Sequence, residues 1–159
     1  MVRFVVISIL VCLCFSGTGF AQIDGLGVGV MLSNPTGVSL KKWSGSTTAI
    51  GGGVAWGFGN QDTFRVHIDY LFHNFALFEV PKGSLPLYYG IGGQIEFEDI
   101  GIESQKDDNE VGVRAPIGIN YIFEDSPVDA FFELVPRFNF APSTKFKISG
   151  GIGIRYFFD

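Results

Sequence analysis

The stretch Phe64-Arg65-Val66-His67-Ile68-Asp69-Tyr70-Leu71-Phe72 decides how the rest of this sequence is interpreted. Apolar side chains occupy every second position of it, and the positions between them hold Arg65, His67, Asp69 and Leu71. Successive side chains of a β-strand point to opposite faces, whereas a helix would distribute these charges around its whole circumference. The stretch therefore predicts a strand with one apolar face and one polar face.

The same alternation recurs in seven further segments of the chain. They are residues 25–32, 38–43, 49–58, 87–97, 111–123, 129–138 and 146–158. Turn-forming residues separate most of the segments, and a longer charged connection spans 98–110. The 22 glycines argue against a helical protein, because glycine costs about 1 kcal/mol per helical position relative to alanine. We predict an all-β fold, an eight-stranded antiparallel up-and-down β-barrel that forms one domain.

Two features predict which face of this barrel is outside. Glycines accompany the polar face, and the interior of an eight-stranded barrel is narrow enough to favour small side chains. With the N-terminus in the periplasm, aromatic residues gather at two rims: Trp43, Tyr70, Phe72, Tyr88, Tyr89, Tyr121, Phe123, Tyr156 and Phe158 at one, and Trp56, Phe58, Phe64, Phe97, Phe138 and Phe146 at the other. Such girdles flank the apolar band of membrane barrels. We therefore expect a transmembrane β-barrel whose polar face points inward.

The polar faces would place ten charged or titratable side chains inside the barrel. They are Arg65, His67, Asp69, Glu96, Arg114, Asp129, Glu133, Arg137, Lys147 and Arg155. Their signs nearly balance, and an unpaired charge in a narrow interior is costly, so we expect ion pairs across the lumen. Pro116 and Pro136 lie inside predicted strands, and a bulge at either one would shift the inward register by one residue.

The first 21 residues have the organisation of a secretory signal. Arg3 precedes an apolar stretch at 4–14, and Gly19 and Ala21 supply the small residues for cleavage after Ala21. That stretch is shorter than the roughly 20 residues of a membrane-spanning helix. We predict that residues 1–21 are removed and that residues 22–159 form the barrel; an uncleaved anchor and a lipoprotein signal are the alternatives.

The mature chain would lack the features of several protein classes. Cys12 and Cys14 leave with the signal, so neither disulfides nor thiolate sites are expected. Loss of Arg3 changes the formal charge from −5 to −6, and no basic patch for nucleic acid remains.

The end of the chain carries a recognisable pattern. Gly151, Gly153, Tyr156 and Phe158 resemble the terminal signal that the barrel-assembly machinery of outer membranes reads, with Asp159 following as an extra residue. With the girdles, this makes the chain similar to the small bacterial outer-membrane barrels typified by OmpX and the transmembrane domain of OmpA. The resemblance implies export to the bacterial outer membrane as a monomer in contact with lipid and lipopolysaccharide.

No motif in the sequence points to catalysis, a cofactor or a metal ion. Six residues separate His67 from His73, too far along a strand for both to bind one metal. His67, Asp69 and Ser149 share one type of face, but such sets arise easily in a polar lumen, and the His-x-Ser pattern of barrel-type lipid A deacylases is missing. The acidic connection 98–110 lacks the spacing of an EF-hand, although it could hold divalent cations near lipopolysaccharide.

The expected function follows from architecture rather than from an active site. We expect a non-enzymatic structural or surface-interaction protein whose polar, salt-bridged lumen is plugged. Two other functions stay open on the sequence alone. One is a narrow channel for small solutes, and the other is a periplasmic lipocalin-like carrier whose apolar faces point inward around an apolar ligand.

Overall fold

The computed structural model describes residues 25–57, 62–99 and 109–158. In these residues the chain forms nine strands: β1 Leu26–Ser33, β2 Thr36–Trp43, β3 Thr48–Gly57, β4 Asp62–Asn74, β5 Leu87–Asp99, β6 Glu110–Arg114, β7 Ile117–Ile122, β8 Val128–Ala141 and β9 Lys145–Phe158. Across this part of the chain, no helix is long and apolar enough to cross a membrane. The predicted signal 1–21, Phe58, Asp159 and most of the connection 98–110 lie outside the described residues.

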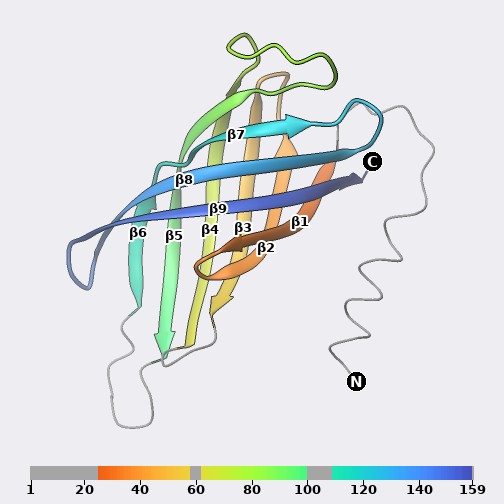
Figure 1. Ribbon diagram of the computed structural model, residues 1–159. Helices are drawn as coiled ribbons and strands as arrows, with labels where there is room; N and C mark the ends of the chain where they lie inside the picture. The colour runs from red at the N-terminus through yellow and green to blue at the C-terminus, as the bar shows by residue number, and fades with distance from the viewer. Residues whose placement is uncertain (1–24, 58–61, 100–108, 159) are drawn as a thin grey trace, which may run out of the picture.

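The strands close into a ring (Figure 1). Strands β1 to β6 pair antiparallel in chain order, as do β7 to β9. β1 also pairs with β9, where Leu26 lies opposite Phe158 and Ser33 opposite Gly151. β6 and β7 both lie between β5 and β8, so they are two halves of one position in the ring. The predicted eight-stranded antiparallel up-and-down barrel is therefore confirmed, with one strand divided into two pieces.

The division falls at Ala115 and Pro116. Hydrogen bonds continue across it, because Ala115 N donates to Pro136 O at 3.0 Å and Gly90 N donates to Pro116 O at 2.9 Å. Pro136 itself stays within β8, opposite Ile148. The burial pattern alternates without a shift beyond both prolines. The one irregular register of β8 lies between its pairs with Val111 and Gly112.

The faces of the strands are inverted relative to those of a water-soluble protein. On β4, Ile68 is 63% exposed, whereas the adjacent Asp69 is 6% exposed. The other strands repeat this arrangement, with outward residues such as Ile91, Ile148 and Leu134 exposed and inward charges buried. Apolar side chains thus form a continuous outer surface, here called the apolar belt, and polar side chains fill the interior.

Inward glycines make room for the larger side chains of neighbouring strands. A Cβ at Gly53 would lie 2.7 Å from His67 Cε1, and a Cβ at Gly153 would meet the ring of Phe131. Contacts this close force neighbours to move, so these positions accept no larger side chain without repacking. This crowding explains why glycine accompanies the polar face in the sequence.

Pairs of outward aromatic rings lie at both ends of the ring of strands. We call the end where β1 begins and β9 ends the terminal rim, and the other end the opposite rim. Outward aromatic rings pair at the terminal rim, where the Phe72 and Tyr89 centroids lie 5.7 Å apart and those of Tyr156 and Phe158 lie 4.8 Å apart. Phe64 and Phe97 pair near the opposite rim at 6.1 Å.

Two of the aromatic residues assigned to the girdle point inward instead. Tyr88 is buried, and its hydroxyl donates to Glu133 Oε2 at 2.8 Å. Trp43 has the same parity as the buried Ser39 and Lys41, and it packs against the side chains inside the barrel. The expectation for both residues was wrong, because position in the alternation determines their direction and aromatic character does not.

Candidate functional site

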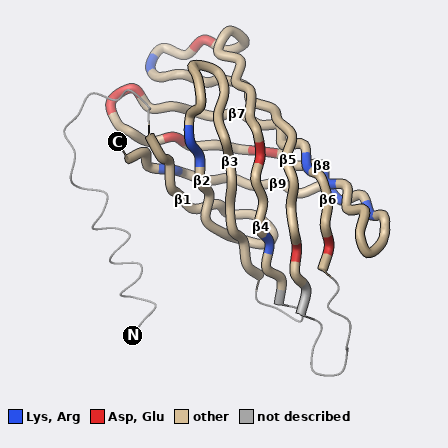
Figure 2. The backbone as a smooth tube through the Cα atoms, turned by 180° about the vertical axis from the view of Figure 1, so that it is seen from behind, with Lys and Arg blue, Asp and Glu red and all other residues tan. Residues whose placement is uncertain are grey.

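The lumen is the candidate site, because the inward faces of all the strands converge there. Figure 2 shows Lys and Arg in blue and Asp and Glu in red along the strands between the two rims. Nine of the ten side chains predicted to face inward are buried: Arg65, His67, Asp69, Glu96, Arg114, Asp129, Glu133, Arg137 and Arg155. Lys147 is partly buried near the opposite rim. The contacts of these residues fall into three groups along the barrel.

The first group lies towards the terminal rim around Asp129. Arg155 binds this carboxylate with two parallel hydrogen bonds, Nε to Oδ1 at 2.8 Å and Nη2 to Oδ2 at 3.0 Å. Its guanidinium also donates to Ser39 Oγ at 3.3 Å and to Asn120 Oδ1 at 3.1 Å. Lys41 Nζ lies 3.7 Å from Asp129 Oδ2. One fully buried carboxylate therefore lies beside two basic side chains from different strands.

The second group lies at mid-height and is centred on Arg114. Its Nε atom lies 3.0 Å from Asp69 Oδ1, and its Nη2 atom lies 3.6 Å from Glu133 Oε1. The Arg114 Nε and Asp69 Oδ1 atoms have no aligned hydrogen bond within the described residues, so the first contact is an ion pair. Arg114 thus connects β4 with β8 across the lumen.

The third group lies towards the opposite rim around two glutamates. Glu96 pairs with Arg65, with Arg137 at 3.1 Å and with Lys147 at 3.5 Å. Glu110 pairs with Lys145 at 2.7 Å and with Lys147 at 2.8 Å. Lys147 therefore joins both carboxylates into one network.

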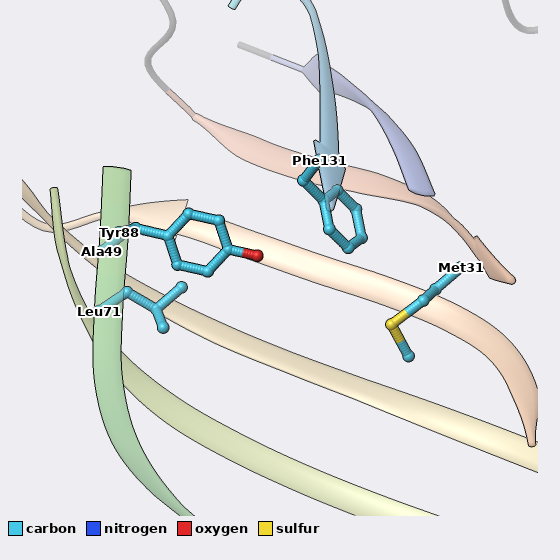
Figure 3. Close-up of a cluster of buried hydrophobic side chains, with 5 residues drawn as sticks. All are labelled: Met31, Ala49, Leu71, Tyr88 and Phe131. Carbon is cyan, nitrogen blue, oxygen red and sulfur yellow. The ribbon is translucent and has the colours of Figure 1, made fainter. Parts of the chain in front are cut away.

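Apolar side chains and a small cavity occupy the space between these groups. Figure 3 shows Tyr88 and Leu71 projecting from one wall towards Phe131 and Met31 on facing strands. The cavity has a volume of about 10 Å³, which is room for about one water molecule. His67, Arg114, Glu133 and Ser149 are among its lining residues.

The contacts of His67 are those of a polar side chain that packs inside the lumen, and they do not form a catalytic arrangement. His67 Nε2 lies 3.9 Å from Asp69 Oδ2, beyond hydrogen-bond distance. The histidine shares the cavity with Ser149, but neither residue forms a hydrogen bond with the other among the described contacts. In the same part of the chain, no cluster of three His, Cys, Asp or Glu side chains could hold a metal ion.

Sequence reasoning missed several members of the network. Lys41 and Glu110 are buried charges, and Gln94, Asn120 and Asn139 are buried amides. Gln94 Nε2 donates to Asn139 Oδ1 at 3.1 Å, and Asn139 Nδ2 donates to Glu110 Oε2 at 2.5 Å. Parity was the available signal, because Lys41 follows Ser39 by two positions and Glu110 precedes Gly112 by two.

The predicted assembly signal lies on β9, the strand that closes the ring against β1. Tyr156 and Phe158 lie on its outer face with their rings in contact, and Gly151 and Gly153 lie on its inner face. In this pattern the two glycines therefore leave space inside the barrel, and the two aromatic rings lie outside it at the terminal rim.

Comparison with known proteins places this architecture among small barrels. The N-terminal β-barrel domain of Pseudomonas aeruginosa OprF is similar with a TM-score of 0.60 and 15% identity, covering 84% of this chain and 95% of that one. Neisserial surface protein A (NspA) is similar with a TM-score of 0.53 and 12% identity, covering 84% and 93%.

Both are small outer-membrane barrels of eight strands, which confirms the expected resemblance at the level of the fold. No curated protein matches the chain. Residues 21–158 match one family, and the chain belongs to it: "Protein of unknown function (DUF3996)".

Proposed function

We propose that this protein spans a bacterial outer membrane as a monomeric, non-enzymatic barrel with a plugged lumen, and that it acts as a structural or surface-interaction protein. The observation that carries the proposal is the apolar belt on a closed ring of paired strands. A soluble protein rarely exposes an apolar patch larger than a few hundred Å². A belt that encircles the molecule instead matches a hydrocarbon surrounding.

The backbone fits the same surrounding. Lipid offers no hydrogen bonds, so spanning structures must satisfy every backbone group internally, and closed barrels do so. From Phe64 to Phe72, β4 advances about 26 Å, which at a tilt of about 40° gives about 20 Å of height. That height is close to the apolar band of outer-membrane barrels, and aromatic pairs lie at both of its edges.

The ion pairs support a plugged lumen. Arg114 of β6 joins Asp69 of β4 to Glu133 of β8 at mid-height. Nearer the terminal rim, Asp129 of β8 pairs with Arg155 of the adjacent β9 and also faces Lys41 of β2, three strands away around the ring. A solute would have to displace these pairs and leave buried charges without partners, which costs several kcal/mol each. Planar-bilayer recording of the purified protein is expected to show no sustained open steps. Reproducible large steps would favour the narrow-channel alternative.

The carrier alternative requires the reverse arrangement of faces. A lipocalin-like protein surrounds its ligand with apolar side chains, whereas the inward positions here hold charges and amides. In the proposed orientation the terminal rim faces the periplasm. The barrel-assembly machinery would then recognise β9, and lipid and lipopolysaccharide would contact the belt.

Fractionation combined with gel migration tests membrane insertion directly. The protein should remain in the outer-membrane fraction after carbonate washing, and its band should shift when the detergent sample is boiled, because a closed barrel resists unfolding at room temperature. A protein that is released into the soluble periplasm and shows no shift would contradict the proposal and favour the carrier.

A further inference from the structure

The connection between β4 and β5 differs from the other turns of the terminal rim. It comprises twelve residues, 75–86, whereas the turn 44–47 has four residues and the turn 123–127 has five. Outer-membrane barrels ordinarily have short turns at the periplasmic end and longer loops outside. A long connection at this rim therefore calls for its own explanation.

The first half of this connection is apolar and exposed. Leu77 is 54% exposed and Phe78 is 45% exposed. The Phe75 ring, in contrast, packs against the inward Trp43 and His73, with centroid distances of 6.3 and 6.4 Å. The neighbouring turns of the same rim are more polar: residues 44–47 read Ser-Gly-Ser-Thr, and in residues 123–127 the exposed Phe123 precedes the exposed Glu124 and Asp125. Two adjacent exposed apolar side chains, Leu77 and Phe78, therefore distinguish this connection from those two turns.

Both ends of the connection are fixed to the barrel. Ser84 and Ile122 exchange two backbone hydrogen bonds of 3.0 and 2.8 Å, and Asn120 N donates to Pro86 O at 3.0 Å, so residues 84–86 extend the β5 wall beside β7. At the other end, Ala76 N donates to Asn74 Oδ1 at 2.9 Å. Figure 1 shows the connection standing beyond the ends of β4 and β5.

Leu77 and Phe78 follow directly on a strand that carries the edge of the belt. The two strands that the connection joins carry the stacked Phe72 and Tyr89 rings at the terminal rim, next to the connection. Leucine and phenylalanine side chains next to such a girdle lie at the depth where apolar side chains enter the boundary between headgroups and acyl chains. The nearby Glu79 and Lys82 can keep their charges among the headgroups.

We propose that residues 76–80 insert into the interfacial layer of the lipid leaflet at the terminal rim, with Leu77 and Phe78 as the anchoring side chains. This inference rests on the membrane-spanning function proposed above. The proposed occupant is the lipid surface itself, because Leu77 and Phe78 are exposed next to the outward Phe72 and Tyr89 rings at the edge of the belt. The inserted connection anchors this side of the barrel and so fixes its height and tilt in the membrane.

Site-specific fluorescence in vesicles tests the proposal. In a full-length Cys12→Ser/Cys14→Ser background, a single cysteine at Leu77, Ile68 or Asp125 carries an environment-sensitive fluorophore, and Phe78→Cys provides a second probe of the connection. Each protein is reconstituted in phosphatidylcholine vesicles with and without brominated acyl chains, and its heat-dependent gel shift checks folding. Leu77→Cys and Ile68→Cys are matched by Asp125→Cys, which lies on a polar turn of the same rim.

The expected emission of the Leu77 and Phe78 labels is blue-shifted relative to that of the Asp125 label, and bromolipid quenches it. The Ile68 label, in the middle of the belt, is quenched as well. If bromolipid quenches the Ile68 label while the labels at Leu77 and Phe78 behave like the one at Asp125, the connection does not insert into lipid. The proposal is then wrong, and Leu77 and Phe78 would bind a soluble partner instead. If the Ile68 label also escapes quenching, membrane insertion itself fails.

Discussion

At the scale of single residues, the lumen depends on a few carboxylates that each hold more than one cation. Asp129 is the clearest case, because it is fully buried and its two oxygens face Arg155 and Lys41. Replacing a buried ion pair by apolar groups can be nearly neutral, but removing one partner leaves a buried charge uncompensated. The asymmetry makes Asp129 a sensitive position.

Asp129→Ala is therefore expected to lower the free energy of unfolding by about 3–5 kcal/mol, because Arg155 and Lys41 lose their shared carboxylate. Urea titration of the protein folded in vesicles measures this quantity. Asp125→Ala, in an exposed turn, is the control and should change stability by less than about 0.5 kcal/mol. Equal effects of the two substitutions would contradict the assigned role of Asp129.

The inward glycines allow a second test at this scale. Gly153→Ala should destabilise the barrel by about 1–3 kcal/mol, since the new methyl group meets the Phe131 ring. In a double-mutant cycle, the loss in Gly153→Ala/Phe131→Ala should be smaller than the sum of the losses in the two single variants. The part of the Gly153→Ala loss that remains without the Phe131 ring reflects the nearby Val30 carbonyl. At Gly150 a Cβ would make ordinary contact with Leu134, so Gly150→Ala is the matched control. Absence of any coupling between Gly153 and Phe131 would exclude the packing explanation.

At the scale of elements, each strand presents its outer face at a particular depth. Ile68→Arg places a charge near the middle of the belt and should cost about 2–4 kcal/mol in vesicles. Phe64→Arg, near the opposite rim, should cost only about 0–1 kcal/mol, because the charge reaches the headgroups. Unfolding titrations of both variants in the same lipid compare the two depths. A larger loss for Phe64→Arg would show that the belt is placed wrongly.

The inward residues of strands with long, clear alternation could be predicted from the sequence. Those of short strands, and the division of one strand into two pieces, were harder to predict. β4 and β9 alternate over their whole length, so their inward residues follow directly from parity. In β2 the alternation is short and Lys41 and Lys42 are adjacent, so only the parity of Ser39 distinguishes the buried Lys41 from the exposed Lys42. The division at Ala115 and Pro116 likewise depends on how β5 and β8 share their hydrogen bonds with two short pieces.

At the scale of the whole molecule, the number of strands and the inverted faces followed from period two, the glycines and the aromatic rims. The partners within the lumen did not follow, since they depend on the stagger between strands that are far apart in the sequence. Arg114 illustrates this: alternation predicts that it points inward, but only the closed ring brings it between Asp69 and Glu133.

Closure of the ring can be tested at the seam between β1 and β9. Val28 lies opposite Tyr156, so cysteines at these two positions should form a disulfide in the folded protein and yield a circular chain on a non-reducing gel. The pair Val28→Cys/Ile148→Cys is the control, because Ile148 is opposite Pro136 instead. Equal cross-linking of both pairs, or none in either, would contradict the register of the seam.

The same seam sets the order of events during biogenesis. Leu26, at the beginning of the first strand, finds its partner in Phe158, at the end of the last one, so a chain still emerging from the ribosome has nothing to close against. Until β9 arrives, both edges stay open and the apolar faces meet water, which invites aggregation. We therefore expect chains that stop before β9 to aggregate, even though the strands that they contain would be stable in the closed ring.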